Sequence, residues 1–195
     1  MKYTLLGILV LVLIGAGWVY MSYNEIITKN EDVSAKWAQV ETQYQRRLDL
    51  IPNLVESVKG AAEFETDTFT AVAEARGRMT SVSVDASKLD AASIATYQAA
   101  QGELTSALSK LMVVVERYPD LKATENFLNL QSQLEGTENR ISVARRDFTE
   151  SVQRYNVLIK KFPGNILADK FGFAEKGYFT AEEGAETAPK VDFNE

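Results

Sequence analysis

The 195-residue sequence contains no cysteine and no histidine. Without them the chain can form no disulfide, no thiolate nucleophile, no Cys/His zinc site and no imidazole general base. A helical di-iron site built on Glu-x-x-His is excluded for the same reason. The sequence also shows no glycine-rich phosphate loop and no nucleophile elbow. We therefore expect a non-enzymatic protein with no cofactor and no metal, and leave open only a calcium or magnesium site made of carboxylates.

Helix breakers and excess positive charge are also scarce. The chain has 4 Pro and 11 Gly, so long uninterrupted elements are expected. Its formal net charge of -6 argues against a nucleic-acid-binding surface. With 46% hydrophobic and 25% charged residues, the composition is that of an ordinary globular domain with its own core.

A run without charged residues is present near the amino terminus, from Tyr3 to Asn24. About 20 helical residues cross the hydrocarbon core of a bilayer, so the segment from Leu5 to Met21 is just long enough. The aromatic residues at its far end suit the membrane interface. We predict a transmembrane anchor over residues 1–23. Its predicted anchor residues include Leu5, Ile8, Leu11, Ile14, Trp18 and Met21.

A cleavable signal peptide is the alternative to a retained anchor. Lys2 could serve as its basic region, and the small residues at 15–17 could provide the cleavage site. We prefer the anchor because the helical pattern continues past Gly17 without a break. Lys2 and the terminal amine precede the span, which favours a cytoplasmic amino terminus and an extracytoplasmic domain.

Beyond the span, apolar residues recur at alternating spacings of three and four, which predicts amphipathic helices and no strands. The stripe of the first helix consists of Ile26, Val33, Trp37, Val40, Tyr44 and Leu48. Asp49 could cap a helix and Pro52 would then fall in its first turn, so we predict a corner with a second helix beginning at Leu50. One helix kinked at Pro52 is the alternative.

Three further signals place the remaining helices. Residues 80–90 are rich in Ser and Asp and predict a loop. The third helix should end before Pro119, and the fourth should run from a Thr124 cap to the "FPGN" sequence at 162–165. The expected fold is all-α, with an N-terminal transmembrane helix followed by an antiparallel up-and-down four-helix bundle over residues 24–162.

Several motifs resemble those of one bacterial family. They are "KWAQVETQYQRRLDLIPNLVESVKG", "ENRISVARRDF", "YN" at 155–156 and the closing "APKVDF". Together they resemble the LemA family of bacterial membrane proteins over nearly the whole chain. The resemblance implies a single-pass protein of the bacterial inner membrane whose molecular activity is poorly defined. One member takes part in building magnetosome membranes, which implies membrane organisation by analogy.

Six arginines raise the question of an anion site: Arg46, Arg47, Arg76, Arg140, Arg145 and Arg146. We prefer the interpretation that they pair with glutamates on the helix flanks and that their stems pack at helix edges. Arg76 falls on a stripe position, which predicts a buried, paired charge that fixes the helix register.

The C-terminal part divides into an aromatic segment, residues 163–180, and an acidic flexible tail, residues 181–195. An up-and-down bundle returns the chain to its starting end, so the aromatic segment should lie near the bilayer or cover the end of the bundle. The candidate membrane-proximal residues are Ile166, Leu167, Phe171 and Phe173. In the tail, Lys190, Val191 and Phe193 are candidate partner-binding residues, because Val-x-Phe alternation can add a strand to a partner's sheet. A frayed end is the alternative.

These features favour a membrane-anchored scaffold or adaptor that organises membrane proteins or membrane structure. The expected partners are the lipid bilayer and a membrane-associated protein of unknown identity, with self-association left open and no nucleic acid. One alternative is a small-ligand sensor with an inter-helix pocket near Gln101, Thr137 or Arg76. Another is a secreted soluble helper released by signal cleavage.

Overall fold

The computed structural model describes residues 2–60 and 65–180, and it confirms the predicted all-α fold. The elements are α1 (Lys2–Lys59), α2 (Thr66–Ser81), α3 (Ala91–Glu116), α4 (Pro119–Lys122), α5 (Glu125–Lys160) and α6 (Gly164–Phe171). No strand occurs within the described ranges.

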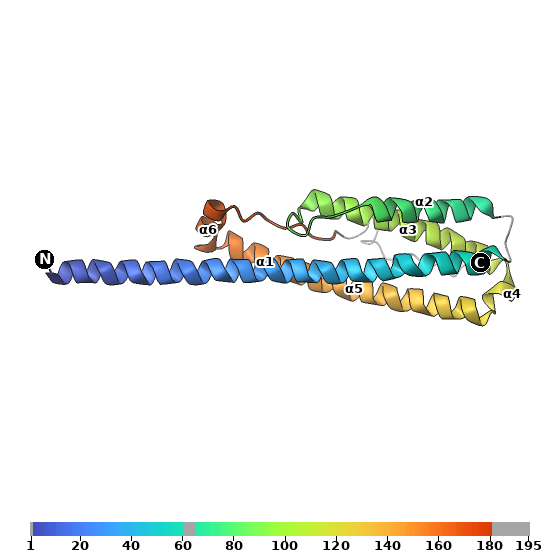
Figure 1. The fold of residues 1–195 in the computed structure, drawn as a ribbon, viewed down its shortest axis with the longest axis horizontal. Coiled ribbons are helices and arrows are strands. Elements are labelled where there is room, and N and C mark those ends of the chain that lie inside the picture. Colours follow the sequence, from blue (N-terminus) through green and yellow to red (C-terminus); the bar gives the residue numbers. More distant parts are fainter. Residues whose placement is uncertain (1, 61–64, 181–195) are drawn as a thin grey trace, which may run out of the picture.

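The long helices run side by side along one axis (Figure 1). α1 packs along α5, and α2 packs along α3. The first part of α1 projects beyond the other helices, and α6 lies beside α1 near the point where it emerges (Figure 1). Side chains from both helix pairs meet in one hydrophobic core, which includes Trp37, Val72, Leu104 and Phe148, all with no exposed surface.

The predicted apolar stripe of the first helix is buried in full. Ile26, Val33, Trp37 and Val40 have no exposed surface, and Tyr44 and Leu48 are nearly as buried. The same spacing continues without interruption through Ile51, Leu54 and Val58. Because the stripe does not change direction near Pro52, burial favours one straight helix there.

The predicted corner at Asp49 and Pro52 is therefore wrong: α1 passes through Pro52 and ends at Lys59, and no helix begins at Leu50. A proline inside a helix costs about 3 kcal/mol. The buried side chains on either side, at about 1.5–3 kcal/mol each, outweigh it. Asp49 caps nothing here. Its carboxylate accepts a hydrogen bond from Gln45 Nε2 at 2.8 Å, one turn earlier in the same helix.

Arg76 explains how the structure tolerates Pro52. Proline has no N–H, so the carbonyl of Leu48, four residues earlier, lacks its usual helical donor. Arg76 Nε of α2 donates to this carbonyl oxygen at 3.2 Å. The side chain is half-buried and its Nε partner is a backbone carbonyl, not the carboxylate that the stripe position predicted. Arg76 thus links α2 to α1 through the acceptor that Pro52 leaves free.

This link predicts coupled effects of Arg76→Met and Pro52→Ala in urea unfolding of the full chain in detergent. Arg76→Met alone leaves the Leu48 carbonyl without a donor and should lower the free energy of unfolding by about 1–3 kcal/mol. With alanine at position 52 the helix supplies its own N–H, so the same change should cost at least ~1 kcal/mol less. Additive effects, within about 0.5 kcal/mol, would show that the two residues act independently.

The remaining helix ends follow local signals that the sequence contains. Thr124 Oγ1 accepts a hydrogen bond from Phe127 N at 3.4 Å, which confirms the predicted cap of α5. The 80–90 loop is confirmed from residue 82 onward, and at its end Asp90 Oδ1 accepts from Ser93 N at 2.7 Å. α3 ends at Glu116 ahead of Pro119, and α5 ends at Lys160 ahead of "FPGN", as predicted.

Candidate functional site

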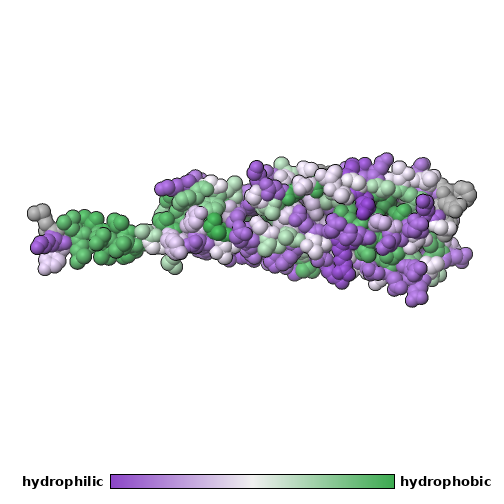
Figure 2. Space-filling view, in the orientation of Figure 1, coloured by the Kyte–Doolittle hydropathy of each residue, from purple (hydrophilic) through white to green (hydrophobic). Residues whose placement is uncertain are grey.

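The projecting part of α1 is a continuous apolar surface (Figure 2). Among the described helices, α1 alone is long and apolar enough to cross a membrane by length and composition, and none of its most apolar stretch is buried by the rest of the chain. A core helix of a water-soluble domain would be covered by its neighbours. An apolar surface exposed on every side needs another partner, and a bilayer provides one.

The predicted anchor residues all lie on this exposed surface. They are Leu5, Ile8, Leu11, Ile14, Trp18 and Met21, of which Met21 is 72% and Trp18 40% exposed. They share one broad face of the helix, but the residues between them from Leu5 to Ile14 are exposed as well, so the packed helices cover no side of this segment. Their contact with lipid stays a prediction.

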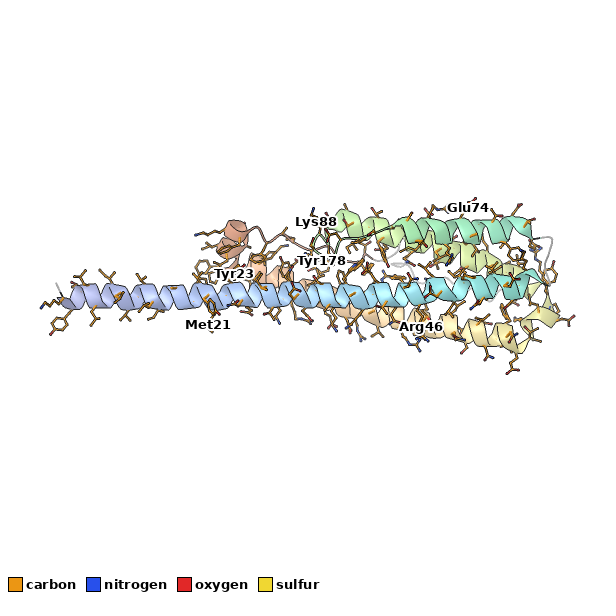
Figure 3. The ribbon with its side chains drawn as sticks, viewed as in Figure 1. Met21, Tyr23, Arg46, Glu74, Lys88 and Tyr178 are labelled. Carbon is orange, nitrogen blue, oxygen red and sulfur yellow. The ribbon has the colours of Figure 1, made fainter. Side chains whose placement is uncertain are left out.

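An aromatic cluster forms where the apolar stretch meets the packed helices. The ring of Tyr23 lies 4.9 Å from that of Phe171 and 5.8 Å from that of Phe173, between centroids. Figure 3 shows Tyr23 on the side of α1 that faces α6 and Met21 on the opposite side. These contacts hold α6 against α1 at the first turn after the apolar stretch.

The four candidate membrane-proximal residues divide into two kinds. Leu167 is buried and Phe173 is half-buried, so these two help to cover the end of the packed helices. Ile166 and Phe171 are 55% and 49% exposed. The segment therefore has exposed apolar side chains suited to lying near the bilayer and buried ones suited to covering the end of the packed helices.

After α6 the chain reverses at Gly172, whose φ of 76° is the left-handed conformation that glycine adopts readily. Residues 173–180 then run back along the packed helices in an extended form, and we call them the C-terminal segment. Asn156 of α5 holds this segment with both ends of its amide. Its Nδ2 donates to Lys176 O at 2.8 Å, and its Oδ1 accepts from Lys176 N at 2.9 Å.

The other side of the C-terminal segment contacts the loop before α3. Gly177 N donates to Leu89 O at 2.7 Å, and a Cβ on Gly177 would come within 2.6 Å of Ala91 Cα. Only glycine fits this approach. Lys176 Nζ donates to Ser87 O at 2.8 Å. Burial lowers the pKa of Lys176, and the carboxylates of Asp85 and Glu31 oppose this shift.

Phe179 packs against the pair formed by α1 and α5. Its ring centroid lies 6.1 Å from that of Trp37 and 5.6 Å from that of Phe148, and the Arg145 guanidinium lies 4.6 Å above it. Such stacking and cation–π contacts add to the hydrophobic burial. Tyr155 also takes part, since its hydroxyl donates to Ala174 O at 3.1 Å.

The motifs that carry the family resemblance therefore converge on the C-terminal segment. Trp37 belongs to the first motif, Arg145 and Phe148 to the second, and Tyr155 and Asn156 to the third. This convergence was not predicted from the sequence. The motifs and the C-terminal segment both contain aromatic residues, but nothing in the sequence indicates that these residues contact one another.

The arginines have separate partners. Arg47 is buried, with Nη1 3.2 Å from the Glu138 carboxylate and Nη2 donating to Thr105 Oγ1 at 3.1 Å, which confirms the pairing interpretation at this position. Arg76 binds a carbonyl and Arg145 an aromatic ring. These contacts give Arg47, Arg76 and Arg145 structural roles on α1, α2 and α5.

Each polar residue proposed for a ligand pocket donates a hydrogen bond within the protein, and Gln101 Oε1 is buried without a hydrogen-bond partner among the described residues. Thr137 Oγ1 donates to Gln133 O at 2.7 Å, and Gln101 Nε2 donates to Met79 Sδ at 2.8 Å. Arg76 donates to Leu48 O. The sensor interpretation gains no support from these contacts. Among the described residues, no group of three acidic side chains is placed to hold a metal ion. Lys190, Val191 and Phe193 lie outside the described residues.

Comparison with known proteins gives a family match over most of the chain. Residues 36–193 match the model of the LemA family. The chain is 29% identical over 188 residues to magnetosome protein MamQ 2 of Paramagnetospirillum magneticum, covering 86% of this chain and 68% of the relative. It is 30% identical over 188 residues to magnetosome protein MamQ of Magnetospirillum gryphiswaldense, with the same coverage. Protein LemA of Metamycoplasma hominis is 22% identical over 160 residues, 82% of this chain and 69% of the relative. The chain belongs to the LemA family.

Proposed function

We propose that the protein is a non-enzymatic scaffold or adaptor, anchored by one span in the bacterial inner membrane. The observation that carries this proposal is the continuity of α1. Its exposed apolar stretch and its buried stripe belong to one unbroken helix. A helix that is lipid-facing in one half and core-forming in the other would fix the packed helices in a set position above the bilayer.

The body of this scaffold is, in our proposal, an antiparallel up-and-down four-helix bundle formed by α1, α2, α3 and α5 over residues 24–162. Contacts between the two helix pairs support it. The Trp37 and Tyr97 rings lie 5.0 Å apart between α1 and α3, and Arg47 joins α1 to Thr105 of α3. Successive long helices point in opposite directions in Figure 1.

The relatives support a role at membranes. MamQ proteins carry the name of magnetosome proteins. By analogy, we propose that this chain organises membrane structure or membrane proteins, with its body on the extracytoplasmic side. Self-association and the tail are the two routes by which it could gather partners.

In this proposal, residues 181–195 recruit a protein. Thr180, the last described residue, is held by Gln98, whose Oε1 accepts from Thr180 N at 3.1 Å. The tail thus starts from a fixed point on α3. Lys190, Val191 and Phe193 would then bind the sheet edge of a partner.

Crosslinking in the native membrane tests this recruitment. The full chain should give a crosslinked protein partner that disappears when residues 189–195 are removed and in Val191→Ser/Phe193→Ser. Asn194→Ser, a polar exchange in the same tail, should keep the crosslink. A partner that persists without residues 189–195 would exclude the recruiting tail, and no partner at all with the intact chain would contradict the adaptor function.

A further inference from the structure

A groove opens where α1 leaves the predicted bilayer, between α1 and the corner joining α5 to α6. On α1 it is lined by Trp18, Ser22, Glu25 and Lys29, and on the other side by residues that include Arg154, Lys161 and Phe162. Its volume is about 450 Å³. The fold creates this groove because α5 runs back along α1 to the point where the apolar stretch ends (Figure 1).

The lining of the groove combines apolar side chains near the span with cations, of which Lys161 directly precedes Phe162 and Lys29 lies further along α1. Trp18 is the wall residue nearest the apolar stretch, and Phe162 opposite it is 80% exposed. Lys29 lies eleven residues further along α1, about 16 Å at 1.5 Å per residue. The Cα–Cβ bond of a helical residue tilts toward the helix amino terminus, so the Lys29 side chain leaves α1 in the direction of the predicted bilayer.

The charges of the groove favour an anion. It is lined by the cations Lys29, Arg154 and Lys161 and by one carboxylate, Glu25. Arg154 already forms two ion pairs: its Nη2 lies 3.5 Å from Asp32 Oδ2, and its Nη1 lies 3.7 Å from Glu150 Oε2. Within the described part of the chain, Lys29 and Lys161 lie in no ion pair, although Lys29 is half-buried. A ligand with a negatively charged head and an apolar chain would match both the cations and the aromatic residues of the groove.

We propose that this groove binds one anionic phospholipid from the surrounding leaflet. The phosphate would lie between Lys29, Lys161 and Arg154, and the upper acyl chain along Trp18 and Phe162. Continuity with the membrane span favours a lipid over a soluble anion, since lipid is the solvent at that end of the groove. This inference rests on the proposed membrane anchoring and adds a lipid preference to it.

The test uses the full chain in nanodiscs of phosphatidylcholine with or without phosphatidylglycerol, followed by native mass spectrometry of the lipids that stay bound. The wild-type chain should retain phosphatidylglycerol over phosphatidylcholine. Lys29→Gln/Lys161→Gln should lower this preference roughly 10- to 30-fold, since each lysine near an anionic surface contributes on the order of one factor of five. Lys29→Arg/Lys161→Arg should restore it.

Lys59→Gln/Lys110→Gln is the matched control, because it removes the same charge from exposed positions near the carboxyl ends of α1 and α3, away from the groove. If both double Gln variants lost the phosphatidylglycerol preference equally, net charge alone would explain the effect, and this result would overturn the proposal. So would equal retention of both lipids by the wild type, or displacement of bound phosphatidylglycerol by inorganic phosphate. A chain that integrates into the nanodisc without a lipid preference refutes this inference alone, whereas a chain that does not integrate refutes the anchor itself.

Discussion

Replacing Trp37 with alanine is expected to lower the free energy of unfolding by about 3–5 kcal/mol. Trp37 has no exposed surface, and it lies where several elements meet. Its ring centroid is 5.0 Å from that of Tyr97 on α3, 5.3 Å from that of Phe148 on α5 and 6.1 Å from that of Phe179. Alanine would leave a cavity between both helix pairs and the C-terminal segment. Domains are usually stable by about 5–15 kcal/mol, so this loss is large.

Urea unfolding of the full chain in detergent, followed by circular dichroism, measures the effect. Leu128→Ala is the control, because Leu128 is 50% exposed on α5 and its loss should change the free energy by no more than about 0.5 kcal/mol. Limited proteolysis adds a local readout. Without Trp37 the chain after residue 172 should be cut faster, since Phe179 loses its stacking partner. A loss below about 1 kcal/mol would show that Trp37 is not central to the core.

The stripe that contains Trp37 could be predicted because helical periodicity is local. Residues three and four apart fall on one face whatever the rest of the chain does, so Val33, Trp37 and Val40 identify a buried face from spacing alone. The same reasoning failed at Pro52. There the local preference of proline opposed burial against other elements, and only the structure shows that Arg76 of α2 satisfies the carbonyl that proline leaves free.

The C-terminal segment shows a second limit. Its aromatic residues were visible in the sequence, but its partners are distant: Asn156 is 20 residues from Lys176, and Ser87 is 89 residues away. Hydrogen bonds to backbone atoms leave no periodic trace, because many side chains could make them. The lipid groove was missed for a similar reason. Lys29 and Lys161 are ordinary lysines until α5 returns beside α1.

These contacts also connect the motifs with the proposed tail function. The C-terminal segment is fixed by α5 on one side and by the loop before α3 on the other. A partner that pulled on residues 181–195 would therefore act on both helix pairs, through Phe179 on α1 and α5 and through Thr180 on Gln98 of α3. A tail joined to a frayed helix end would transmit no such force. The motif residues are thus placed to couple tail binding to the packing of the whole body.

Two arginines in the middle of the apolar stretch should abolish membrane integration. An arginine at the centre of a span costs about 2.5–3.5 kcal/mol, whereas leucine or isoleucine favours insertion by about 0.5 kcal/mol. Leu11→Arg/Ile14→Arg should therefore shift insertion by roughly 6–8 kcal/mol. After alkaline carbonate extraction, the wild type should remain with the membrane pellet and the variant should move to the supernatant. Val113→Arg/Leu128→Arg is the control, because it adds the same charges at exposed positions of α3 and α5.

The same samples separate a retained anchor from a signal peptide, which both depend on an apolar segment. An anchor requires that the mature wild-type protein in the pellet still begins before Leu5, as amino-terminal sequencing would show. A product that begins near Trp18 and appears in the extracytoplasmic soluble fraction would identify the secreted helper instead. Cleavage there would also remove most of the exposed stretch of α1, and the groove at Trp18 would then face water and no longer face lipid. The anchor, the lipid groove and the fixed position of the packed helices therefore all require that residues 2–21 of α1 are retained in the mature protein.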